Sequence, residues 1–136
     1  MAKVENKRMI KLKGRVLLFD EIDINHDKFS KDCKINFSGK VPLMTWNFNH
    51  NDSIGFAVPV KDDKGIYAKA EIFCDNYARI KDIFANGKIG VGGYYKIVKK
   101  HKEGELVVID EATLLEIGLT LAPVRAEYFF AIVEDE

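Results

Sequence analysis

The chain has 136 residues, of which 47% are hydrophobic and 31% charged, a globular composition that excludes intrinsic disorder. Its 21 basic and 21 acidic residues cancel, so bulk electrostatics give no reason to expect a nucleic-acid partner. No apolar run approaches the roughly 20 residues of a membrane-spanning helix, and the N-terminus lacks the apolar stretch of a secretory signal.

The length suits one domain, which we expect to span residues 1–136 with a core at about 10–133. Hydrophobic periodicity is mostly that of strands. In the N-terminal third, the pattern predicts a strand at 9–19, a polar loop with a short helical piece at 20–34, and a strand at 40–48 that leads into a loop containing His50.

A hairpin is the clearest element of the middle of the chain. The β-prone runs 53–60 and 66–73 flank Lys61-Asp-Asp-Lys-Gly65, a turn cluster ending in glycine. In the second run Ala68, Ala70 and Ile72 alternate with charged residues. This period of two predicts a half-buried strand.

One helix is predicted at 75–86, because apolar residues recur there at helical spacing and Asn86-Gly87 is a typical C-terminal stop. Further strands are expected at 89–99, 106–109, 114–121 and 127–133, with a polar turn at 100–104. The expected fold is therefore α+β and mostly β: a small closed or nearly closed antiparallel β-barrel with one or two flanking helices, which hides the strand edges.

Two residues are candidates for chemistry. His50 heads a loop after an apolar strand, and either a loop-capping or a catalytic role fits it. Glu116 interrupts an apolar strand, so it either faces solvent or is held by a partner such as the His50 imidazole. His26 and His101 lie in charged segments and are expected to be solvated.

A nucleophile is harder to find. Ser53 follows His50 on the same loop and is expected to be a turn residue, since triad members usually come from different elements. Cys33 and Cys74 show neither an activating motif nor metal-ligand spacing, so we expect free buried thiols, no metal and no cofactor. The run Gly90-Val-Gly-Gly93 fits a bulge, a tight bend or the close approach of another backbone.

Taken in order, several segments resemble the prohead protease family of tailed phages, the capsid maturation serine proteases related to herpesvirus assemblins. The resemblance covers roughly residues 10–133. It rests on Gly14-Arg-Val-Leu-Leu-Phe-Asp-Glu-Ile-Asp23, Phe48-Asn-His-Asn-Asp-Ser-Ile-Gly55, Asp62-Asp-Lys-Gly-Ile-Tyr-Ala-Lys-Ala-Glu71, the helix ending at Asn86-Gly87, and Leu115-Glu-Ile-Gly-Leu-Thr-Leu-Ala-Pro123.

The resemblance implies that His50 occupies the position of the catalytic base and Glu116 that of the residue orienting it. The serine position falls on Gly92 or Gly93, depending on the anchor used, and neither residue has a hydroxyl. Asn51 replaces the family's aspartate after the histidine, and the chain ends without the longer tail of active members. Both departures favour a natural pseudoprotease over an engineered serine knockout.

The leading hypothesis is thus a catalytically inactive, prohead-protease-like virion protein with a structural or assembly role, such as capsid decoration. Its partners would be capsid or other virion proteins and further copies of itself, and its location the virion or, during assembly, the host cytoplasm. Two alternatives stay open: an active maturation protease with an atypical nucleophile such as Ser53, and a β-barrel binding module unrelated to phage.

Overall fold

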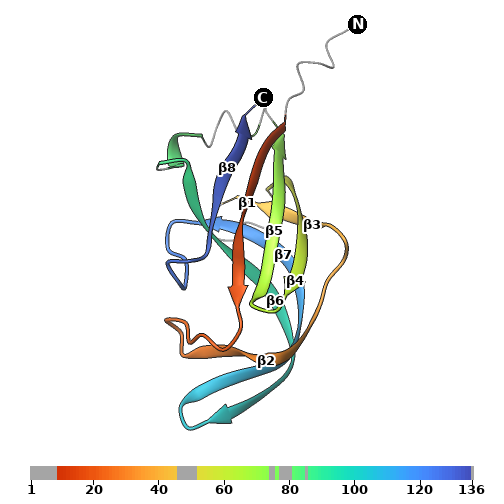
Figure 1. Cartoon of the computed structure of the whole chain (residues 1–136), viewed down its shortest axis with the longest axis vertical. Coiled ribbons are helices and arrows are strands. Elements are labelled where there is room, and N and C mark those ends of the chain that lie inside the picture. The colour runs from red at the N-terminus through yellow and green to blue at the C-terminus, as the bar shows by residue number, and fades with distance from the viewer. Residues whose placement is uncertain (1–8, 46–51, 74–75, 77–80, 85, 136) are drawn as a thin grey trace, which may run out of the picture.

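The computed structural model describes residues 9–45, 52–73, 76, 81–84 and 86–135. Eight strands form a single sheet, shown in Figure 1. They are β1 (Met9–Leu18), β2 (Asp27–Asn36), β3 (Val41–Met44), β4 (Ser53–Asp62), β5 (Gly65–Phe73), β6 (Lys88–Glu103), β7 (Leu106–Thr120) and β8 (Phe129–Asp135).

Seven of these strands close into a barrel, as the sequence predicts. The order runs β7-β3-β4-β5-β1-β8-β6, and β6 pairs with β7 to complete the ring. Most neighbours are antiparallel, but β3 runs parallel to β7. Closure pairs both edges of each barrel strand over at least part of its length, although β8 pairs with only Lys88 to Gly90 of β6.

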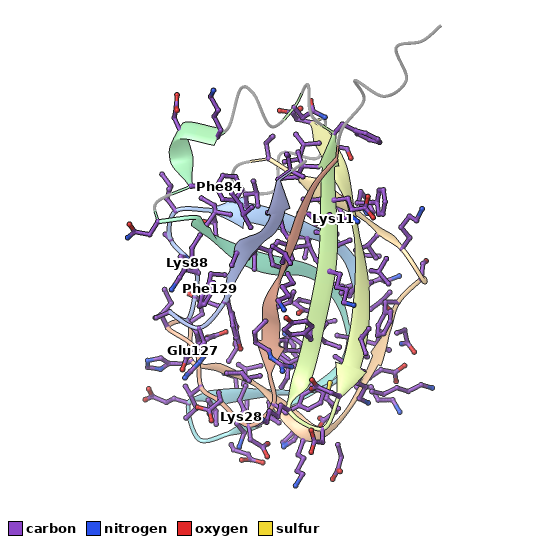
Figure 2. The ribbon with its side chains drawn as sticks, turned by 45° about the horizontal axis from the view of Figure 1, so that its top comes forward. Lys11, Lys28, Phe84, Lys88, Glu127 and Phe129 are labelled. Atoms are coloured by element: carbon purple, nitrogen blue, oxygen red, sulfur yellow. The ribbon has the colours of Figure 1, made fainter. Side chains whose placement is uncertain are left out.

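The barrel interior is filled by aliphatic side chains from alternate positions of each strand, because successive side chains of a strand point to opposite faces. On β5, Ala68, Ala70 and Ile72 are buried, while Lys69 is exposed, which confirms the predicted alternation. Phe84 packs against this core from outside the strands, and the Lys88 ammonium lies 4.6 Å from the centre of the Phe129 ring (Figure 2).

The β6–β7 hairpin reaches beyond the barrel, and β2 lies parallel to the first half of β7. In Figure 1 the tip of this hairpin lies at the end opposite the start of β1 and the end of β8. β2 corrects the prediction of a polar loop over 20–34. Its alternation is interrupted by a register shift between Phe29 and Lys34, and β7 covers only one of its edges, so polar residues are tolerated along it.

Two predicted boundaries in the second half are also wrong. Residues 106–109 and 114–121 were expected as separate strands, yet β7 is continuous across Asp110 and Glu111, which are half-buried. The polar turn expected at 100–104 is strand as far as Glu103, because these exposed residues pair with β7 in the projecting hairpin.

The helix predicted at 75–86 falls mostly outside the described residues. Within the described part, Lys81–Ile83 form one turn of 3-10 helix. Asn86 and Gly87 both have positive φ angles, 55° and 76°, as a chain-reversing Asn-Gly pair before β6 requires. Among the helical residues that the structure describes, none forms a helix of membrane-spanning length and apolarity.

Candidate functional site

Glu116 lies on the outer face of β7. Its neighbour Ile117 is fully buried in the barrel, and the alternation of the strand turns Glu116 to the opposite side, where it is half-buried. Across the ladder Glu116 is paired with Tyr94, and Gly118 is paired with Gly92. Paired residues point to the same side of a sheet, so these four positions share one outer face.

The β6–β7 register distinguishes Gly92 from Gly93, the two positions between which the sequence could not choose for the serine. Gly93 is paired with the buried Ile117 and faces the barrel interior. A Cβ atom on Gly93 would lie 2.6 Å from the hydroxyl oxygen of Tyr95, so the Tyr95 side chain occupies the space of any side chain there. Gly92 faces outward and is a diagonal neighbour of Glu116, a relation that places two residues roughly 7–8 Å apart.

Gly90, the first residue of the run Gly90-Val-Gly-Gly93, also lacks room for a side chain. A Cβ atom at this position would lie 2.5 Å from the carbonyl oxygen of Thr120 and 2.8 Å from the Pro123 ring. Of the interpretations offered by the sequence, close approach of a neighbouring backbone is therefore what the structure contains at Gly90.

His50 and Asn51 lie outside the described residues, but Thr45 and Asp52, on either side of segment 46–51, contact each other. The Thr45 amide donates to the Asp52 carbonyl oxygen at 3.1 Å, and the Thr45 hydroxyl donates to the Asp52 carboxylate at 2.8 Å. Met44, next to Thr45, is paired with Gly118. Thr45 and Asp52 thus lie near Gly118, the outer-face position that pairs with Gly92.

Ser53, the alternative nucleophile, has its hydroxyl within hydrogen-bond distance of two carbonyl oxygens, 3.4 Å from that of Leu43 and 3.2 Å from that of Gly55. It is paired with Met44, at the point where the β3–β4 register shifts. These contacts fit a residue that satisfies backbone groups at a bulge.

Cys33 is fully buried, and burial raises the pKa of its thiol to about 11. The nucleophilic form of cysteine is the thiolate, so this thiol is inert near neutral pH. The expectation of a free buried cysteine is thus confirmed for Cys33, whereas Cys74 lies outside the described residues. Within the described ranges, histidine, cysteine and carboxylate side chains form no cluster able to hold a metal ion.

Comparison with solved structures shows the fold. The chain is similar to KSHV protease, a herpesvirus protease, in its complex with a hexapeptide phosphonate inhibitor. The TM-score is 0.58 at 9% sequence identity, and the match covers 94% of this chain and 66% of that chain, just under two thirds of its length. No family model matches this chain, and no curated protein matches it in sequence. The chain therefore has the barrel fold of a viral protease.

Signals in the sequence could have located more of this outer face. Gly118 stands within the quoted Leu115–Pro123 segment, and its position two residues after Glu116 places both on one side of a strand. Tyr94, which is 44% exposed, and the Thr45–Asp52 pair carry no such pattern, since their proximity depends on strand register.

Proposed function

We propose that this protein is a catalytically inactive protease-like domain of a tailed phage or prophage, acting as a structural or assembly component of the virion. The observation that carries the proposal has two parts: the fold is that of a viral protease, and a glycine stands at the outer-face position diagonal to Glu116. Gly92 has no atom that could attack a peptide carbonyl, and a serine protease without its nucleophile retains only residual rate.

The distance between Gly92 and Glu116 supports descent of this outer face from a catalytic triad. A diagonal separation of roughly 7–8 Å leaves room for one imidazole ring between a side chain at position 92 and the Glu116 carboxylate. His50 is the candidate for that ring, on the resemblance described above. In this proposal the fold persists because its surfaces bind capsid proteins or further copies of the chain.

Catalytic silence is tested with a fluorophosphonate probe, which labels activated serines. We expect no labelling of the wild-type protein and no cleavage of capsid precursor. Labelling that is lost on His50→Ala would overturn the proposal, and Ser53→Ala would then show whether Ser53 is the reacting residue. The matched variants Gly92→Ser and Gly93→Ser extend the test, since a gain of labelling is expected only at position 92.

The structural role needs a separate measurement. Quantitative mass spectrometry of purified virions is expected to find many copies of the protein in each particle if it decorates the capsid. A transient assembly role predicts that it is found in precursor particles instead. Absence from both, or a gene neighbourhood without terminase, portal or capsid genes, would favour a binding module unrelated to phage.

A further inference from the structure

One outer face of the barrel carries a groove of about 460 Å³. The groove crosses four neighbouring strands, from β4 through β5 and β1 to β8. Phe56 and Val58 of β4 line it at one end of this strand order, and Val133 of β8 lines it at the other. Both valines are exposed. The groove therefore offers apolar surface that a partner can cover.

The charged lining of the groove is mainly basic. It consists of Lys11 and Lys13 on β1 and Lys69 on β5, with one carboxylate, Glu71. Lys11 is directly opposite Glu71 in the ladder, but Lys13 is directly opposite Lys69. Like charges at opposed positions of a ladder repel each other. An anionic partner in the groove would offset this repulsion.

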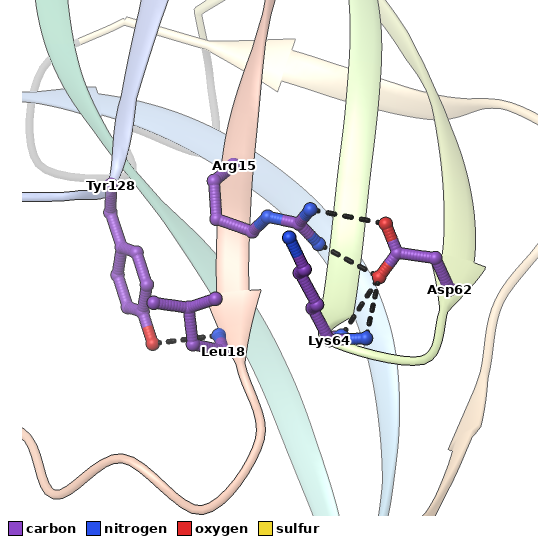
Figure 3. A network of polar contacts seen from close by, with 6 residues as sticks. Arg15, Leu18, Asp62, Lys64 and Tyr128 are labelled. Atoms are coloured by element: carbon purple, nitrogen blue, oxygen red, sulfur yellow. Dashed lines mark hydrogen bonds and ion pairs between the residues drawn. The ribbon is translucent and has the colours of Figure 1, made fainter.

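Two further cations belong to this side of the barrel. The Lys40 ammonium lies 4.2 Å from the centre of the Phe56 ring, which adds positive charge beside β4. Arg15 donates two hydrogen bonds to the Asp62 carboxylate, at 2.9 and 3.0 Å (Figure 3), so its charge is balanced within the chain. The excess positive charge of this face is therefore carried by its lysines.

The loop between β1 and β2 has the complementary character. Its residues 20–27 include four carboxylates and no lysine or arginine. Between the carboxylates stand Ile22 and Ile24, which are 52% and 71% exposed. Exposed isoleucines next to acidic residues match a groove that is apolar at its rim and basic in its charged lining.

Part of the acidic charge of this loop is used within the chain. Glu21 contacts the Arg125 guanidinium at 3.3 Å, so it offers little to a partner. Asp23 instead accepts hydrogen bonds from the backbone amides of Asn25 and Asp27, at 2.8 and 3.1 Å. Because an amide carries no net charge, these bonds fix the shape of the loop and leave it acidic.

The loop is also tied to the segment before β8, so that its two isoleucines are presented to solvent. The Ile24 amide donates to the Val124 carbonyl oxygen at 3.3 Å. The Ile22 carbonyl oxygen accepts a hydrogen bond from the Arg125 guanidinium at 2.8 Å. Since the backbone is held while the side chains stay exposed, a partner that covers them has little loop motion to restrict.

The groove and the loop lie towards opposite ends of the barrel. β1 contributes Lys11 and Lys13 to the groove in its first half, and the loop begins only after Leu18, beyond the arrowhead of this strand in Figure 1. From Lys13 to Leu18 alone, the strand advances about 17 Å. The loop of one chain is therefore out of reach of its own groove, and another copy has to supply it.

We propose that this groove binds residues 20–24 of a second copy of the chain. The two isoleucines of that loop lie against Val58 and Val133, and its acidic charge lies beside Lys13 and Lys69. Groove against groove would instead bring the lysines of both copies together, so the contact is heterologous and leads to rings or open chains of subunits. It gives a location to the self-association included in the proposed function, but it requires neither catalytic silence nor a virion.

Sedimentation equilibrium of the full-length protein measures this contact. One loop in one groove is smaller than a standard interface, so we expect weak association that appears between about 20 µM and about 1 mM. The weight-average mass should rise beyond that of a dimer, because a heterologous contact does not stop at two copies. It should fall again at high salt, which screens the lysines. A monomer mass throughout this range at low salt would overturn the proposal.

Two variants each block one side of the contact. Lys69→Glu reverses a charge in the groove and places a carboxylate opposite Lys13, a change that should not destabilise the fold. Ile24→Ser removes an apolar contact at an exposed position. We expect each variant to weaken association roughly tenfold or more. Lys102→Glu and Val98→Ser, matched controls on the projecting hairpin, should leave it unchanged.

An equimolar mixture of the Lys69→Glu and Ile24→Ser proteins tests whether the two surfaces meet. The first protein keeps an intact loop and the second an intact groove. Together they should form a 1:1 dimer that cannot grow further, at a concentration where each alone is monomeric. A mixture that stays monomeric, or control variants that lose association to the same extent, would overturn the proposal.

Discussion

Substituting alanine at Gly93 and at Gly92, in separate variants, tests the β6 register on which the outer face depends. At Gly93 the new Cβ atom would lie 2.6 Å from both the Tyr95 hydroxyl oxygen and its ring carbon Cζ. Ordinary carbon contacts begin near 3.5 Å, so the Tyr95 ring has to move by about 1 Å. The Tyr95 ring packs on Phe29, with centroids 4.8 Å apart, and forced repacking of this kind typically costs about 1–3 kcal/mol.

A compensating term reduces that cost. Replacing glycine by alanine lowers the conformational entropy of the unfolded chain and stabilises the fold by about 0.4–1 kcal/mol where the backbone permits it. The net expectation for Gly93→Ala is a loss of about 1–2 kcal/mol. For a domain of this size that corresponds to a melting temperature about 4–8 °C lower. Gly92→Ala faces outward, so we expect a smaller change.

Differential scanning calorimetry on both variants measures the difference, and a double-mutant cycle assigns its cause. In a Tyr95→Ala background the obstructing ring is gone, so Gly93→Ala should no longer destabilise the protein. The reasoning is wrong if Gly93→Ala melts at or above the wild-type temperature, or if Gly92→Ala proves the more destabilised of the two.

Three further predictions concern titratable groups. Asp62 accepts two hydrogen bonds from Arg15, at 2.9 and 3.0 Å, and two from the turn amides of Lys64 and Gly65 (Figure 3), and chiefly the Arg15 contact lowers its pKa. Because the folded-state pKa lies below the ordinary value of 3.8, this stabilisation is present above that pH and is lost as the pH falls further. Asp62→Asn should therefore lower stability by roughly 0.5–1 kcal/mol at neutral pH, given the partly exposed pair, and the difference in denaturation midpoint should shrink in acid. His101 contacts Asp110 at 2.6 Å and Glu103 at 2.9 Å, and these hydrogen bonds raise its pKa. An NMR titration should give a midpoint above 6.5, and Asp110→Asn should lower it; an unchanged midpoint would contradict the contact. In a Cys74→Ser background, Cys33 should resist a thiol reagent at pH 8 and react only on unfolding, whereas rapid modification of the native protein would contradict its burial.

The barrel could be predicted because its strands carry local signals. The β4–β5 hairpin has a clear sequence signal, a turn cluster between two alternating runs. In the structure Asp62 is paired with Gly65 across that turn. β1 and β8 are likewise apolar runs bounded by polar segments, and both were predicted within a few residues of their observed limits. In such strands the alternation of apolar and polar residue types directly predicts which side chains are buried and which are exposed.

β2 could not be predicted because its pairing partner is distant in sequence. Phe29 and Cys33 are its buried side chains before Ile35, and their spacing of four is helical rather than strand-like. The shift in register between Phe29 and Lys34 produces this spacing, and only the presence of β7 alongside reveals it. Local propensity thus predicted the wrong element where a long-range ladder decides the conformation.

The candidate site was predictable in its residue types but not in its geometry. Glu116 was singled out because a carboxylate is unusual in an apolar strand, and the structure places it on the outer face. The choice between Gly92 and Gly93 needed the β6–β7 register, since a slip of one residue exchanges the two faces of a strand.

The same register gives the two glycines different reasons to lack a side chain. Gly93 is required by packing, because the Tyr95 hydroxyl lies where its Cβ atom would be, so its missing hydroxyl needs no functional explanation. Gly92 shares the outer face with Glu116 and Gly118. We infer that Gly92 alone carries the evidence for a lost nucleophile. Were the register shifted by one residue, the missing hydroxyl would belong to the barrel interior, and a proteolytic ancestry would rest on the fold alone.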